Sequence, residues 1–175
     1  MKKKLLFFSF TLLIAAVATH GQPAIKIFAY EQQSLPGTVP VGIKDENGNP
    51  IKKAAAKTNY FIFLSFKKNC IVTPVQVLIK GFSFSIDSLT DVKKIPVEYT
   101  NHTIPNDSHK TILVPKTSNR VIKINLAEPG QPVESNNHIK SLAKTNDLVI
   151  IYTWNKKKYY TAVKKMTVLE PILNE

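Results

Sequence analysis

Cysteine is almost absent from this chain, because Cys70 is the only one among its 175 residues. A single thiol can form no internal disulfide, so the fold has to rest on packing. Cys70 precedes the apolar pair Ile71 and Val72, which favours a buried, inert thiol. The alternative is a catalytic nucleophile that a nearby histidine activates. The candidate histidines for that role are His102, His109 and His138.

Arginine is also scarce. Arg120 is the only one, although lysine and arginine together number 24 against 12 acidic residues and give a net charge of +12. Specific readers of phosphate and guanine use the paired donors of arginine, so we expect no nucleic-acid partner. The lysines cluster at predicted turns and strand edges, where charge keeps exposed strands from pairing with other molecules.

The functional alternative for the lysines is an attraction for anionic envelope glycans. Aromatic rings beside cations can stack on sugars, and one predicted hairpin tip combines both residue types. The candidate binding patch consists of Lys156, Lys157, Lys158, Tyr159 and Tyr160.

Motifs of catalysis and cofactor binding are missing. The chain has no G-x-S-x-G, no phosphate loop and no H-E-x-x-H. His102 and His109 flank Asp107, but a zinc site usually takes three or four ligands from closer pairs. We therefore expect no metal, no cofactor and no enzyme activity, with an enzyme that uses Cys70 or a histidine as the weaker alternative. Residues 101–103 match the N-glycosylation acceptor pattern, which also arises by chance.

Long apolar runs are missing after the start of the chain, and no later segment reaches the roughly 18–20 residues of a transmembrane helix. The start itself combines basic residues 1–4, uncharged apolar residues 5–17, and the small residues Thr19 and Gly21. This order is typical of a secretory signal peptide.

Cleavage of this peptide is expected after Gly21, which would remove residues 1–21, and a cut after Ala18 is the alternative. No cysteine follows either cut, so we expect no lipid anchor. The mature chain is then residues 22–175, a length that suits a single domain in a secreted or periplasmic protein.

The mature chain alternates apolar and polar residues with a period of two, as half-buried strands do. Residues 60–66 and 148–154 are apolar on both faces, which predicts central strands covered on each side. The predicted strands lie near residues 25–30, 39–44, 60–66, 71–80, 82–86, 92–99, 111–114, 120–126, 148–154 and 159–169. These nine or ten strands predict an all-β fold, an immunoglobulin-like β-sandwich by architecture only, because the cysteine pair of antibody domains is missing.

Turns and one helix interrupt the strands. Residues 67–69 and 155–158 predict hairpins, and two prolines and a glycine in residues 127–132 predict irregular structure. Asn137 is expected to cap a short helix near residues 137–144. The expected apolar face of this helix consists of Ile139, Leu142 and Ala143. The residues expected in the core are Ile62, Leu64, Val77, Ile79, Phe84, Ile150, Tyr152 and Val168.

Residues 39–54 resemble the opening of transthyretin-like carboxypeptidase regulatory domains, where a strand, an Asp-x-x-Gly turn and a second strand follow one another. The sequence after residue 54 departs from that family. The resemblance therefore implies no function for this chain.

Taken with the predicted leader, these patterns favour an exported bacterial binding or accessory module without catalytic activity. We expect its partner to be another protein, whose identity the sequence does not indicate. The alternatives are a basic adhesion module for anionic envelope glycans and the enzyme that uses Cys70 or a histidine.

Overall fold

The computed structural model describes residues 23–36, 56–101, 110–132 and 137–173. The predicted signal peptide, the segment with the family resemblance and the strand expected near residues 39–44 lie outside these ranges. The same holds for His102 and His109.

Ten strands and one helix make up the described part of the chain. They are β1 (Lys26–Leu35), β2 (Lys57–Phe66), β3 (Val72–Ile79), β4 (Phe82–Asp91), β5 (Val97–Thr100), β6 (Lys110–Val114), β7 (Arg120–Pro132), α1 (Asn137–Thr145), β8 (Leu148–Trp154), β9 (Lys157–Val163) and β10 (Thr167–Leu173). The prediction of an all-β fold with one short helix is confirmed. No helix in the described ranges is long and apolar enough to cross a membrane.

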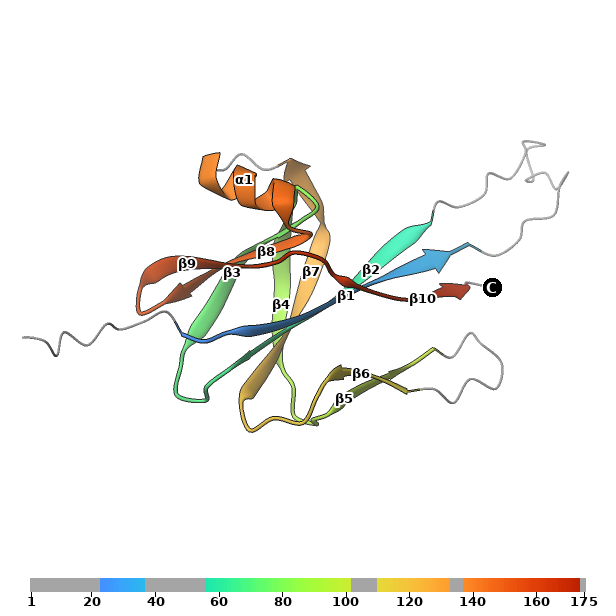
Figure 1. Ribbon diagram of the computed structural model, residues 1–175, viewed down its shortest axis with the longest axis horizontal. Helices are drawn as coiled ribbons and strands as arrows, with labels where there is room; N and C mark the ends of the chain where they lie inside the picture. Colours follow the sequence, from blue (N-terminus) through green and yellow to red (C-terminus); the bar gives the residue numbers. More distant parts are fainter. Residues whose placement is uncertain (1–22, 37–55, 102–109, 133–136, 174–175) are drawn as a thin grey trace, which may run out of the picture.

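Eight of the strands form one curled sheet in the order β10-β1-β2-β7-β4-β3-β8-β9, and β5 pairs with β6 (Figure 1). All neighbours are antiparallel except β1 and β10, which are parallel. The strands β2 and β8, which carry the residues apolar on both faces, each have a neighbour on either side. Their expected central position is confirmed.

The main core fills the inner face of the curled sheet and draws on β1, β2, β3, β4, β7 and β8. Of the eight residues expected in the core, seven are 8% exposed or less, and Val168 is 63% exposed. Val168 was misplaced because residues 159–169 are two strands. A turn separates β9 from β10, so Met166 enters the inner core and Leu169 is buried on the opposite face.

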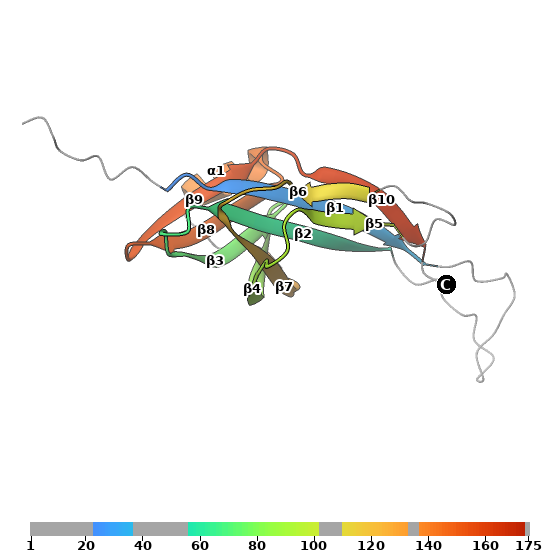
Figure 2. The same ribbon diagram turned by 90° about the horizontal axis from the view of Figure 1, so that it is seen from below.

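A second core lies on the outer face of β1, β2 and β10, where the hairpin β5–β6 covers the sheet (Figure 2). Its buried residues include Phe63 of β2 and Leu113 of β6. The Tyr30 hydroxyl donates a hydrogen bond of 2.6 Å to the carbonyl oxygen of Leu113, which ties β1 to β6. Asn101 donates from Nδ2 to the carbonyl oxygen of Pro171 at 3.1 Å and ties the end of β5 to β10.

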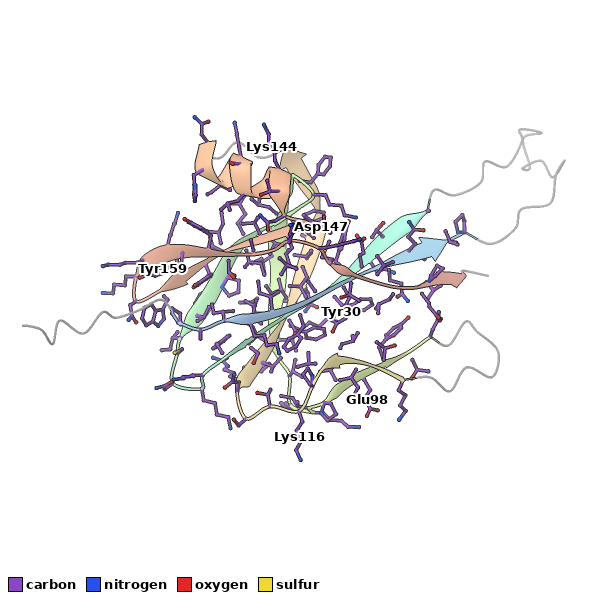
Figure 3. All side chains as sticks on the ribbon, in the orientation of Figure 1. Tyr30, Glu98, Lys116, Lys144, Asp147 and Tyr159 are labelled. Carbon is purple, nitrogen blue, oxygen red and sulfur yellow. The ribbon has the colours of Figure 1, made fainter. Side chains whose placement is uncertain are left out.

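Helix α1 lies over the opposite end of the sheet, next to β8 (Figure 1). Ile139, Leu142 and Ala143 are its half-buried residues inside an otherwise exposed helix, so its expected apolar face is confirmed. Asp147 follows the helix (Figure 3) and contacts two turns, the one after β3 and the one before β10. Its carbonyl oxygen accepts a hydrogen bond from the Lys80 N–H at 2.9 Å. Its Oδ2 accepts from the Met166 N–H at 3.0 Å.

Residues 127–132 belong to β7 and are not irregular, which corrects the sequence prediction. The register with β4 advances three residues on β7 for two on β4 from Phe82 to Phe84, opposite Pro132 and Pro129, and again from Phe84 to Ile86. Each shift inserts an extra residue that the ladder leaves unpaired. Prolines are tolerated at such bulges because no ladder hydrogen bond is required there.

The hairpin predicted at residues 67–69 is wrong. The chain does turn there, with the Cys70 N–H donating to the Lys67 carbonyl oxygen at 2.9 Å. However, β2 pairs with β1 and β7, whereas β3 pairs with β4 and β8, so the two strands on either side of this turn are not partners. The strand expected over residues 92–99 begins only at Val97.

Candidate functional site

The hairpin between β8 and β9 carries the five residues predicted to bind. Its loop is only Asn155 and Lys156, with φ angles of 48° and 62°. Two positive φ angles in a two-residue loop are typical of a type I′ turn, whose twist matches that of the strands. The predicted hairpin is confirmed here, and Lys157 already pairs with Trp154 as the first residue of β9.

The two tyrosines of this predicted patch point to opposite faces of the sheet. Tyr159 packs against the inner core, where it stacks on Tyr152 with ring centroids 5.9 Å apart and contacts Trp154 (Figure 3). Tyr160 is 45% exposed, and its hydroxyl lies 2.7 Å from Nε2 of His138 on α1.

All three lysines, Lys156, Lys157 and Lys158, are exposed. In β9, Lys157 lies on the same face as Tyr159, and Lys158 lies on the same face as Tyr160.

Cys70 lies just before β3, is half-buried and packs against the inner core. Its Sγ lies 3.8 Å from Oδ1 of Asn69. Within the described ranges, no three His, Cys, Asp or Glu side chains are grouped as metal ligands. The acceptor asparagine of the predicted glycosylation pattern, Asn101, is 3% exposed and uses its amide within the fold.

The single arginine also contributes to the fold. Arg120 holds Asp91 through two hydrogen bonds, from Nε at 2.7 Å and from a terminal nitrogen at 2.8 Å. This paired contact lowers the pKa of the Asp91 carboxyl. Arg120 is thus engaged with a residue of the same sheet.

A cleft that the sequence did not indicate lies between β2 and β7. The two strands pair only from Ile62, opposite Ile124, to Phe66, opposite Arg120. In the described part of the chain, residues 57–61 of β2 then pair with β1 alone, and β7 beyond Ile124 pairs with β4 alone. The strands diverge from this point (Figure 1) and leave an opening of about 910 Å³, which we call the β2–β7 cleft.

The inner side of the β2–β7 cleft is apolar. Tyr60 of β2 and Phe84 of β4 meet edge to face across it, with ring centroids 5.8 Å apart and an interplanar angle of 75°. Ile124 and Leu126 of β7 belong to the same side, because they pack with the inner core. Phe82, also in the lining, is 53% exposed.

The outer side of the cleft carries polar and basic residues together with Phe61, which packs with the outer core. Successive side chains of a strand point to opposite faces, so Lys57 and Asn59 of β2, and Lys123 and Asn125 of β7, lie opposite the apolar residues. Asn125 donates from Nδ2 to the hydroxyls of Ser88 and Thr90 at 3.0 and 3.1 Å, in the direction of β4.

Lysine is the only charged residue type in the described lining, with Lys57 and Lys123, and no carboxylate accompanies them. The nearby Glu31, opposite Tyr60 on β1, is paired with Lys80 at 2.6 Å. Tyr60 also offers its hydroxyl as a hydrogen-bond donor, because a tyrosine is protonated at neutral pH and burial raises the pKa of Tyr60 further. The cleft therefore combines aromatic surface, hydrogen-bond donors and positive charge, which are features of binding surfaces.

Sequence reasoning missed this cleft, because the alternation of apolar residues does not tell where two strands stop pairing. One signal was present. Pro129 and Pro132 lie in the distal half of β7, and proline inside a strand is characteristic of edges and bulges.

Comparison with protein-family models, with curated proteins and with solved structures found no match for this chain.

Proposed function

We propose that this chain is an exported bacterial binding or accessory module without catalytic activity, which binds a protein partner through the β2–β7 cleft. Export to the periplasm or the medium is supported by the basic residues 1–4 followed by the apolar residues 5–17. Binding is supported by the cleft and its lining.

The observation that carries the proposal is the combination of size and chemistry in the β2–β7 cleft. An opening of about 910 Å³ has the size of a ligand site, and its lining includes the exposed aromatic ring of Phe82 and two lysines. Exposed aromatic residues with nearby polar groups are typical of surfaces that bind other molecules.

The fold that presents this cleft is proposed to be an immunoglobulin-like sandwich. In support, β9 lies at one end of the sheet order and continues directly into β10 at the other end. Strands that switch between sheets form the corners of sandwiches. An experimental structure with the two ends of the sheet packed face to face, about 10 Å apart, would support this architecture, and a flat open sheet would contradict it.

Intact-mass measurement of the protein outside the cytoplasm tests export. The expected mass corresponds to a chain that begins at Gln22. A mass that retains residues 5–17, or protein found only in the cytoplasm, would contradict it.

A photo-crosslinking residue at Phe82 tests the binding surface in native cells. The matched control is the same residue at Val168, an apolar side chain of β10 that lies outside the cleft lining and is 63% exposed, against 53% for Phe82. We expect the photo-crosslinking residue at position 82 to capture one envelope protein, and the same residue at position 168 not to capture that protein. Equal crosslinking from both positions, or none from Phe82, would contradict the proposal.

A second candidate function is adhesion to anionic envelope glycans through the β8–β9 hairpin. The observation in its favour is the exposed run of Lys156, Lys157 and Lys158 beside the half-exposed Tyr160. Binding to an acidic polysaccharide such as polygalacturonate should then weaken as salt shortens the Debye length. It should also be lost in the double variant Lys156→Ala with Lys158→Ala, whereas unchanged binding in that variant would exclude the hairpin.

A further inference from the structure

We propose that the β2–β7 cleft accepts an extended peptide segment of the partner, which adds as a strand to the free edge of β2 at residues 57–61. The segment alternates apolar residues, which face the inner side of the cleft, with acidic residues, which face its outer side. This inference rests on the proposed function and specifies the chemistry of the partner.

The backbone of β2 supplies the first argument. In the described part of the chain, residues 57–61 pair with β1 on one side, and no described strand pairs with their other side. A free strand edge presents N–H and C=O groups with a two-residue repeat, which is the pattern that another strand completes. Five residues of edge span about 16 Å, the length of a typical short strand.

The contrast with the outer edges of the sheet supplies the second argument. The terminal strand β9 begins with Lys157 and Lys158, and the terminal strand β10 contains Pro171. Lysine and proline are the residues that protect exposed edges against pairing. The free edge at residues 57–61 has no proline and a single lysine, Lys57, at its first position, so residues 58–61 have less of this protection than the outer edges have.

The side chains on either side of the cleft supply the third argument. A strand beside β2 would place alternate side chains against Tyr60, Phe84 and Leu126, which are apolar, and the others beside Lys57 and Lys123. Carboxylates at the second set of positions would neutralise both lysines, which have no acidic neighbour within the described lining. The positive charge of the lining and the alternation of side chains along an added strand therefore both favour a segment of alternating apolar and acidic residues.

A capped six-residue peptide that alternates glutamate and valine serves as the probe, with the mature protein as receptor. One control peptide replaces glutamate by lysine, and a second has the same composition with three glutamates followed by three valines. We expect the alternating acidic peptide to bind about tenfold more tightly than either control, because only it satisfies charge and alternation together. Equal binding of either control peptide, or no binding of the probe, would overturn the proposal.

Amide hydrogen exchange locates the bound peptide. Exchange of the alternate backbone amides in residues 57–61 that face away from β1 should slow by about tenfold on binding, because these N–H groups become hydrogen-bonded. N-methylation of alternate peptide bonds, in two complementary peptides, should abolish binding in at least one of them, because strand addition needs alternate peptide N–H groups. Unchanged exchange in β2, or full binding by both methylated peptides, would show a contact without strand addition and overturn the inference.

Charge reversal on the receptor completes the test. The double variant Lys57→Glu with Lys123→Glu should weaken probe binding by about tenfold, whereas Lys158→Glu on the β8–β9 hairpin should change it less than about twofold. The reverse order would overturn the assignment to the cleft. A partner that crosslinks to Phe82 while the probe fails would leave the proposed function standing and remove only the strand-addition inference.

Discussion

Gln32 of β1 donates a hydrogen bond from Nε2 to the hydroxyl of Tyr99 in β5, and the same nitrogen donates to the carbonyl oxygen of Glu170 in β10 at 2.7 Å. Gln32 is 1% exposed, so one buried amide connects the covering hairpin with two neighbouring strands of the sheet. Buried polar groups of this kind contribute to stability mainly through the cost of leaving their partners unsatisfied.

Replacement of this glutamine should therefore destabilise the fold. Gln32→Ala leaves the Tyr99 hydroxyl and the Glu170 carbonyl without this donor, and we expect a loss of about 2–3 kcal/mol in the free energy of unfolding. Urea denaturation measures it. Gln33→Ala, at the exposed neighbouring position, is the control and should change stability by less than about 0.5 kcal/mol. Equal effects of the two variants would show that the network contributes nothing.

Alkaline pH should lower the stability of the fold by weakening the contacts of Lys80 and Tyr60. The hydrogen bond to Glu31 raises the pKa of Lys80, and burial raises the pKa of Tyr60. A raised pKa in the folded state means that the stabilisation is complete below the unfolded value and is lost as pH rises through the folded value. We therefore expect the urea midpoint to fall above the ordinary lysine value of 10.5.

The variant Glu31→Gln isolates the ion pair in this experiment. It removes the contact that raises the pKa of Lys80, so its urea midpoint should decline less steeply with pH than that of the wild type. Glu170→Gln removes an exposed carboxyl on β10 and should follow the wild-type slope. A Glu31→Gln slope that matches the wild type would contradict the assignment.

The strands that run through the middle of the sheet could be predicted from sequence, whereas their pairing could not. Residues 60–66 and 148–154 are apolar on both faces, and burial on both sides is a local property that a strand carries in its own sequence. Pairing depends on what the rest of the chain supplies. The turn after Phe66 resembles a hairpin turn, yet β7 takes the place beside β2.

Val168 and the β2–β7 cleft show the same limit at finer scale. The sequence pattern predicts one strand over residues 159–169, but a turn interrupts them. The alternation of buried and exposed residues therefore changes after the turn, and Leu169 is buried instead of Val168. The cleft exists because β7 leaves β2 at Ile124 to follow β4, and the only sequence signal nearby, Pro129 and Pro132, lies further along β7. Within the predicted patch at residues 156–160, Tyr159 and Tyr160 face opposite ways because adjacent residues of a strand alternate between the two faces of a sheet.

The β8–β9 turn should gain stability from glycine. Lys156 has a φ angle of 62°, a left-handed conformation that costs a residue with a Cβ about 1 kcal/mol, and glycine adopts it freely. We expect Lys156→Gly to raise the free energy of unfolding by about 0.5–1 kcal/mol, because asparagine followed by glycine is the preferred type I′ pair. Thermal denaturation measures the gain. Lys158→Gly, inside β9, should instead be destabilising, and a loss in both variants would contradict the turn type.

Cys70 should behave as a packing residue whose thiol is only partly accessible. It is half-buried against the inner core, and its Sγ has a contact of 3.8 Å with Asn69. A thiol reagent should label the folded protein more slowly than the urea-unfolded chain, because labelling at full rate requires local opening. Equal labelling rates would show a fully exposed thiol and revive the nucleophile and intermolecular-disulfide interpretations.

Substitution separates packing from chemistry at this position. Cys70→Ala removes a small, partly buried group and should cost about 1 kcal/mol or less in stability, since the site is already partly open to solvent. Cys70 does not line the β2–β7 cleft, so the alanine variant should bind the alternating acidic peptide with unchanged affinity. Calorimetric titration of the two proteins compares these affinities directly. Loss of binding in a variant that remains folded by circular dichroism would mean that the thiol takes part in the site, because a packing role alone changes stability and leaves a distant surface intact.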